Sequence, residues 1–201
     1  MRRTIILAIF LTVAIFCKAQ NLDRIYSFMN DELPAQEFGK SSWGIFLLDQ
    51  PANPDSSYCK KLMLRKLKNV PKNIQSQLYK NCRVLVNNRS QKFHWDQSKM
   101  KHAIIVADTK HNLPLSIISK LKWSTPDIQN AKYWIKEWNK SKIDERLINY
   151  SGIPVFSDDE QYVLILRGQD VRSEGGWDTM YIYKKENGKW IVAERLILSQ
   201  I

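Results

Sequence analysis

The chain has 201 residues, a formal net charge of +11 at neutral pH and 44% hydrophobic residues. This length is enough for one domain with a sizeable core. No internal repeat, low-complexity tract or linker divides the chain, which argues against a repeat array or several domains. We therefore expect a signal peptide at residues 1–19 and a single α+β domain at residues 20–201.

The N-terminal segment has the features of a secretory signal peptide. Two arginines precede an apolar run at 4–16, which is shorter than the roughly 20 residues that span a bilayer. Cys17 and Ala19 place small residues where a signal peptidase reads the chain, so we expect cleavage before Gln20 and export to the periplasm or the extracellular space. Two alternatives remain open: an uncleaved anchor, and a lipoprotein lipidated at Cys17, which the large preceding phenylalanine disfavours.

The first elements of the mature chain are a helix and a strand. Apolar residues at helical spacing predict a helix at 22–33, which Pro34 ends. A short apolar and aromatic run predicts a strand at 42–48. The turn-rich segment 49–57 can cap the helix that follows.

Two short basic helices are expected in the stretch between Cys59 and Cys82. Apolar residues at helical spacing continue on both sides of Pro71, which suits the first position of a second helix, running to residue 81, but not the interior of one long helix. The apolar stripe of both helices must face a core, so the lysines should point into solvent.

The two cysteines of this stretch predict a disulfide. Once residues 1–19 are removed, Cys59 and Cys82 are the remaining cysteines of the chain. A single pair in an exported protein favours a bond between them. Closing this loop would stabilise the fold by roughly 3 kcal/mol in the chain-entropy model. The alternative is two free, buried thiols.

Positive charge is concentrated in one segment of the chain. Residues 60–101 contain twelve Lys and Arg and one acid, whereas the rest of the mature chain contains 16 basic and 19 acidic residues. Such an asymmetry would create a positive patch that attracts anions. The alternative is that these lysines only keep the surface soluble.

Seven side chains are the candidate anion contacts of this segment: Lys60, Lys61, Arg65, Lys66 and Lys68, with Lys72 and Lys80 behind them. Arginine can bind phosphate or carboxylate through two hydrogen bonds, and lysine acts as a point charge. The partners expected for an exported protein are envelope polymers, lipid headgroups, extracellular nucleic acid or another exported protein. The sequence names none of them, and it contains no second apolar run long enough to span a membrane.

The middle of the chain mixes strands and one strong helix. Strands are expected at 83–86 and 103–107, the second as a continuous apolar run typical of burial on both faces. Segment 111–123 is ambiguous between helix and strand. A helix then begins with Thr125 as N-cap and Pro126 in the first position, and we expect it to end before Gly152. Its expected buried stripe is Ile128, Ala131, Ile135 and Trp138.

The last fifty residues predict an antiparallel meander. Strands are expected at 154–156, 162–166, 179–185 and 190–198, with a polar loop at 167–178. The Asn187-Gly188 pair between two strand patterns is a strong hairpin signal. The fold class is therefore α+β, with N-terminal helices packed on an antiparallel sheet that ends in a C-terminal β-meander.

Two stretches of this region, "SGIPVFSDDEQYVLILRG" and "GGWDTMYIYKKENGKWIVAERL", resemble a pattern found in small exported bacterial proteins of unassigned function. The shared pattern is an apolar strand, a Gly-rich loop and a K-K-x-N-G-K-W hairpin. Related sequences often carry Cys-Gly pairs in that loop, where this chain has "RSEGG", so no thiol chemistry carries over. The resemblance implies export and no catalytic residue that can be placed.

Catalytic and metal-binding signals are sparse. His94, His102 and His111 match no compact zinc spacing, and we expect no metal or other cofactor. Asp108 with His111, after the strand at 103–107, is the best acid–base pair, although such residues also make ordinary turns.

The acids Asp170, Glu174 and Asp178, beside Trp177, could act on a sugar if they converge. A solvated loop is the simpler interpretation. Trp134, Trp138 and Trp190 lie at positions that point inward, so we expect them in the core rather than on a ligand-stacking surface.

Three functional hypotheses follow. The first is a non-enzymatic exported binding module whose basic helical segment contacts anionic envelope components. The second is a small envelope hydrolase acting on glycans through Asp108 and His111 or through the acids of 170–178. The third is an accessory subunit of a protein complex.

Overall fold

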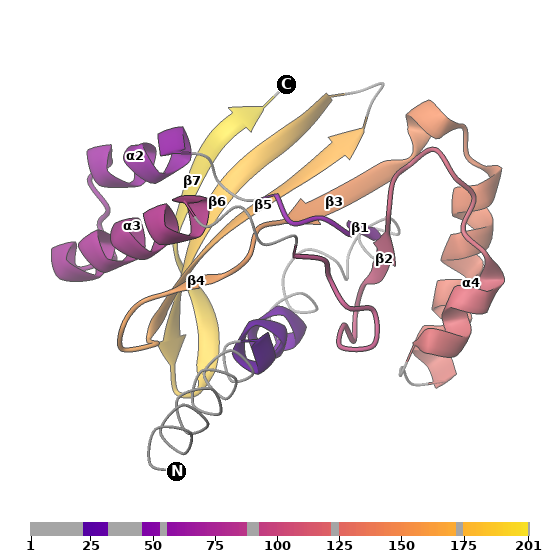
Figure 1. The fold of residues 1–201 in the computed structure, drawn as a ribbon, viewed down its shortest axis with the longest axis horizontal. Coiled ribbons are helices and arrows are strands. Elements are labelled where there is room, and N and C mark those ends of the chain that lie inside the picture. Colours follow the sequence, from indigo (N-terminus) through magenta and orange to yellow (C-terminus); the bar gives the residue numbers. More distant parts are fainter. Residues whose placement is uncertain are drawn as a thin grey trace, which may run out of the picture.

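The computed structural model describes residues 22–31, 46–52, 56–87, 93–121, 125–171 and 175–200. Residues 1–21, and with them the expected signal peptide, lie outside this set. A seven-stranded mixed sheet with helices on both faces forms the domain (Figure 1), which confirms the α+β fold class. The strands are β1 Phe46–Leu48, β2 Ile104–Val106, β3 Leu147–Ser151, β4 Val155–Phe156, β5 Tyr162–Val171, β6 Gly175–Glu186 and β7 Lys189–Gln200. The helices are the segment 22–31, α2 Ser56–Leu64, α3 Lys72–Asn87 and α4 Thr125–Lys140, with 3-10 turns at Leu115–Lys120 and Ile143–Glu145.

The sheet is mixed rather than wholly antiparallel. The strand order is β2-β1-β3-β5-β6-β7, with β4 paired to β5 beside this path. β1 runs parallel to both β2 and β3, while β3, β5, β6 and β7 pair antiparallel. Parallel neighbours need a long crossover, and between β1 and β2 the chain supplies it through α2 and α3. The C-terminal meander is present as expected.

Side chains of β5 show which helices cover each face of the sheet. Val163 and Ile165 pack into a cluster with the helix 22–31, whereas Leu164 and Leu166 pack with α2 and α3. Successive strand residues point to opposite faces, so these helices cover opposite sides. The register of β1, β3 and β5 places Phe46 on the same face of the sheet as α2 and α3, and at its own end of that face Phe46 packs against α4. α2 and α3 thus cover one end of this face and α4 the other (Figure 1).

Two separate helices form, as the sequence predicts, but α2 already ends at Leu64, before the predicted break near 69–71, and α3 is longer than expected. The strand predicted at 83–86 is wrong, because α3 continues to Asn87. The physical reason is packing at helical spacing: after the buried Leu78 and Cys82, Leu85 and Val86 again contact the same core. The β-branched and apolar residues of 83–86 favour a strand locally, but packing against the core stabilises the helix instead.

α4 has the expected buried stripe, since Ala131, Ile135 and Trp138 are fully covered and Ile128 is half-buried. The side chains of residues 125–127, which include the predicted N-cap Thr125, are not among those that the structure describes. The helix ends at Lys140, before Gly152 as expected, and β3 follows where no strand was predicted. The ambiguous segment 111–123 forms a 3-10 turn at Leu115–Lys120.

The polar loop predicted at 167–178 is wrong. β5 extends to Val171 and β6 begins at Gly175, so most of the segment is paired strand. The strands persist because their polar side chains find partners within the sheet. Arg167 is 4% exposed and donates to the Tyr183 hydroxyl at 3.1 Å, and Gln169 donates to Asn149 at 3.2 Å. The predicted hairpin is confirmed, with φ of 51° at Asn187 and 77° at Gly188.

Candidate functional site

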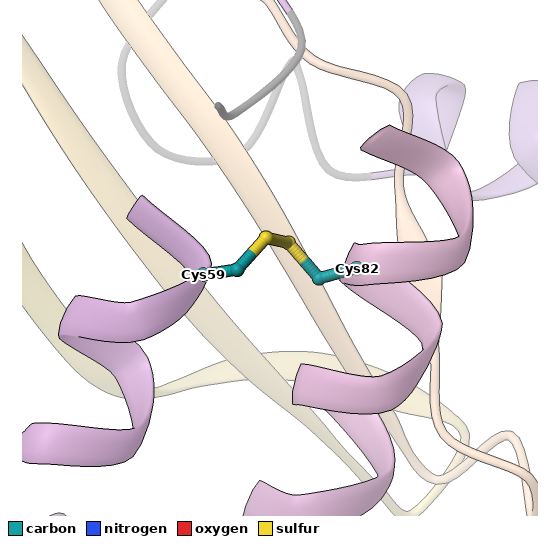
Figure 2. Close-up of a disulfide and its surroundings, with 2 residues drawn as sticks. All are labelled: Cys59 and Cys82. Atoms are coloured by element: carbon teal, nitrogen blue, oxygen red, sulfur yellow. A yellow bond between two sulfur atoms is a disulfide. The ribbon is translucent and has the colours of Figure 1, made fainter. Parts of the chain in front are cut away.

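The basic helix pair α2–α3 is held together by the predicted disulfide. The sulfur atoms of Cys59 and Cys82 lie 2.16 Å apart and join the two helices through their facing sides (Figure 2). Both cysteines are fully buried, together with Leu62 and Leu78 from the same faces. The bond therefore lies under the pair, between the helices and the sheet, and leaves the outer helix faces to solvent.

The connection between α2 and α3 is also fixed. The side-chain amide of Gln75 donates to the carbonyl of Leu62 at 2.5 Å and to that of Arg65 at 3.0 Å, which satisfies carbonyls at the C-terminal end of α2. Glu194 of β7 accepts hydrogen bonds from the backbone N–H groups of Lys68, at 2.8 Å, and of Asn69, at 3.3 Å. These contacts order the turn, and neither Gln75 nor Glu194 carries a sequence signal for this role.

All seven predicted contact residues are exposed, and we call them the basic surface: Lys60, Lys61, Arg65, Lys66, Lys68, Lys72 and Lys80. Residues 60–87 contain no Asp or Glu. Within the described part of the chain, none of the seven makes an ion pair with a carboxylate. An acid that the structure places beside them, Glu194, binds the backbone of Lys68 and Asn69 rather than a charged side chain.

Arg83 extends the basic surface along α3, although it was not among the predicted contacts. It is exposed, and its guanidinium lies 5.7 Å from the centre of the Tyr79 ring. Its position one turn after Lys80 is the signal that could have found it.

The basic segment 60–101 does not form one continuous surface. Its last part crosses to the other face of the sheet, where the backbone carbonyl of Lys99 accepts a hydrogen bond from Asn30 of the helix 22–31 at 2.8 Å. The Lys99 ammonium also lies 3.8 Å from the carboxylate of Asp23. Among the described residues of the segment, the positive patch is therefore formed by α2, α3 and their connection.

The acid–base pair of Asp108 and His111 lies in an exposed turn. The Asp108 carboxylate accepts the backbone N–H groups of Lys110, at 2.7 Å, and His111, at 3.2 Å, and lies 3.0 Å from the His111 ring. These hydrogen bonds, the Lys110 bond foremost, lower the pKa of Asp108. The imidazole is 82% exposed. The geometry is that of a turn closed by an aspartate, and it assigns these residues no reaction.

Asp178 is held by hydroxyl groups from three elements. It accepts hydrogen bonds from Tyr150 of β3, from Ser199 of β7 at 3.0 Å, and from Tyr58 of α2 at 3.5 Å. The Tyr150 ring reaches Asp178 by lying across Gly168, where a Cβ would stand 2.2 Å from the ring. This carboxylate ties α2 to the sheet. The side chain of Asp170, and all of Glu174, lie outside the described residues, so the predicted convergence of the three acids stays a prediction.

Aromatic residues behave largely as core. Trp138 is fully buried against Phe46, with ring centres 4.4 Å apart, and Trp134 and Trp190 are half-buried against the core clusters. Across the described ranges, no group of three His, Cys, Asp or Glu side chains is arranged to hold a metal ion. Among these same residues, no helix is both long and apolar enough to cross a membrane.

One groove joins segments that sequence reasoning did not connect. It lies between the helix 22–31 and the turn at 157–161, with a volume of about 490 Å³. Arg24 pairs with Glu160 there and stacks on Phe156 at 4.1 Å. The Ser157 hydroxyl, donating to Asp159 at 2.5 Å, lowers the pKa of that carboxyl. Arg24 and Glu160 thus neutralise each other, Asp159 is held by neutral donors, and the arrangement suggests no reaction.

Comparison of the chain with protein-family models, with curated proteins and with solved structures finds no significant match.

Proposed function

We propose that this protein is an exported, non-enzymatic binding module whose basic surface on α2 and α3 contacts anionic components of the cell envelope. The observation that carries the proposal is the concentration of seven exposed cations on a disulfide-linked helix pair with no acid between residues 60 and 87. The signal-like segment 1–19 supports export, with cleavage before Gln20.

The helix pair supplies a rigid scaffold for these charges. Because the disulfide, Gln75 and Glu194 hold the backbone, little conformational entropy is lost when the surface meets a polyanion. Clustered like charges raise the local concentration of anions, and the attraction is screened over about 8 Å at physiological salt. Binding should therefore be rapid, tolerant of ligand sequence and strongly dependent on salt.

The test compares two variants of the mature chain that lose the same charge. In the first, Lys60, Lys61, Arg65, Lys66 and Lys68 are changed to Gln. In the control, five exposed lysines outside the basic surface are changed to Gln: Lys110, Lys120, Lys132, Lys136 and Lys189. Affinity for isolated anionic envelope polymers and for soluble polyphosphate is measured across a salt series.

The proposal expects tight binding of the wild type at low salt, loss of binding in the first variant and retention in the control. If both variants bind as weakly as each other, net charge alone matters, and the basic surface is not a site. Weak wild-type binding at low salt would also overturn the proposal. N-terminal sequencing of the exported protein tests the cleavage site, with Gln20 as the expected first residue.

A further inference from the structure

The basic surface contains an apolar side chain that packing does not explain. Leu64, the last residue of α2, is 84% exposed, and its neighbour Met63 is 44% exposed. The next most exposed large apolar residues of the described chain, Tyr133 and Ile197, reach 54%. An isolated exposed leucine is common in soluble proteins, so its surroundings decide whether it has a role.

Helix geometry places Leu64 in the middle of the cations. Successive helix residues are rotated by about 100°, so Leu64 lies beside Lys60 and Lys61 on the side of α2 that faces away from the buried Cys59 and Leu62. Arg65 and Lys66 follow directly along the chain, and both are exposed. The leucine thus has four exposed basic residues as neighbours, two on the helix surface and two along the chain, and it is held outward from the core.

The end of α2 is positioned as a fixed projection. The carbonyls of Leu62 and Arg65, on either side of Leu64, both accept from the Gln75 amide, and the disulfide holds Cys59 one turn earlier. Met63 and Leu64 therefore have no route into the core without breaking these contacts. α2 and α3 also lie at one end of the molecule, opposite the end covered by α4 (Figure 1).

We propose that this projection docks on an anionic phospholipid bilayer, with Leu64 and Met63 entering the acyl chains and the four surrounding cations contacting lipid phosphates. The inference rests on the proposed function and names the partner of the same surface. A polar face rich in Lys and Arg beside exposed apolar residues is the pattern of peripheral membrane binding. Each basic residue near an anionic leaflet adds to the attraction.

A bilayer fits this surface better than a soluble polyanion does. Polysaccharides and polyphosphates offer no apolar phase, so an exposed leucine would gain nothing from them. Single-stranded nucleic acids are held mainly by exposed aromatic side chains that stack on bases. The aromatic residues on this surface, Tyr58 and Tyr79, are half-buried and lie beneath Lys61 and Arg83, whose charges sit 5.3 and 5.7 Å from the ring centres.

The experiment measures binding of the mature protein, residues 20–201, to vesicles by co-sedimentation. One set of vesicles is phosphatidylcholine alone, and the other contains phosphatidylglycerol as roughly a third of the lipid. The test variant is Leu64→Asn. The matched control is Leu115→Asn, because Leu115 is 49% exposed and lies on the 3-10 turn beside α4. Soluble polyphosphate is titrated in parallel against every protein.

The wild type should bind the anionic vesicles and leave the neutral ones largely unbound. Leu64→Asn should weaken vesicle binding about tenfold or more, since burying one leucine contributes on that scale. The same change should leave polyphosphate binding and the Tm unaltered, because Leu64 contacts no core. Leu115→Asn should change none of the three measurements.

The outcomes separate this inference from the function it rests on. Membrane docking is overturned if the wild type does not bind vesicles, or if Leu64→Asn binds them as tightly as the wild type does. If polyphosphate binding still depends on the basic surface in that case, anion binding stays in place. Failure of the wild type to bind either ligand overturns both. Equal loss of vesicle binding in Leu64→Asn and Leu115→Asn would assign the effect to general surface hydrophobicity and would also overturn the docking site.

Discussion

Removing the bond between Cys59 and Cys82 should lower the free energy of unfolding by about 3 kcal/mol. The disulfide joins residues 23 apart in the sequence, and the chain-entropy model assigns roughly 3 kcal/mol to a loop of that length. For a domain of this size each kcal/mol corresponds to about 2–4 °C in Tm, so the Tm should fall by about 6–12 °C. In the double variant Cys59→Ala and Cys82→Ala, the space left by two fully buried sulfur atoms adds about 1 kcal/mol.

The assay is thermal unfolding of wild type and double variant, each with and without reductant. Reductant should lower the Tm of the wild type and leave that of the variant unchanged. Because the bond anchors α2 rather than the sheet, hydrogen exchange should accelerate first in α2, while the amides of β5 and β6 keep their protection. The reasoning fails if thiol titration shows two free cysteines after reduction and the Tm has not moved. In that case apolar packing alone holds the helix pair.

Two further changes test how buried polar groups and close contacts shape the fold. Arg146→Met should destabilise the protein by about 3 kcal/mol in urea unfolding, because the buried guanidinium donates to the carbonyls of Trp138, Thr109 and His111, and the loss of these hydrogen bonds leaves acceptors unpaired. The control Lys142→Met, at an exposed site, should change stability by less than about 0.5 kcal/mol. Equal effects of the two substitutions would contradict the buried role of Arg146. Gly168→Ala should cost about 2 kcal/mol or more, because its Cβ would stand 2.2 Å from the Tyr150 ring. In a Tyr150→Ala background the same change should cost much less, and additive effects of the two substitutions would show that the contact is not responsible.

The role proposed for the helix pair depends on features from distant parts of the chain. Gln75 lies on α3 and Glu194 on β7, yet both fix the backbone around the end of α2. Tyr58 links the start of α2 to Asp178 of β6. The surface that carries the cations is thus mechanically part of the sheet. Changes in β7 should therefore affect binding through the position of α2, without contacting the ligand.

Several features follow from local sequence alone, because neighbouring residues decide them. Pro71 separates the two basic helices, and Asn187 with Gly188 adopts the positive φ angles of a tight hairpin. The pairing of Cys59 with Cys82 is predicted because these two cysteines remain once the expected signal peptide is removed. The seven candidate contacts are all exposed. Those on α2 and α3 lie opposite the apolar stripe of their helix, and Arg65, Lys66 and Lys68 lie in the connection between the helices.

Tertiary structure alone decides the remaining features, because burial depends on partners far along the chain. Residues 83–86 are helical because the core beneath α3 continues past Cys82. Arg167 and Gln169 lie in a strand because Tyr183 and Asn149 accept their hydrogen bonds. The split of segment 60–101 between two faces of the sheet has the same origin. So does the exposure of Leu64: in sequence it is one more apolar residue at the end of a helix, and only the packing of α2 on the sheet turns it outward among the cations.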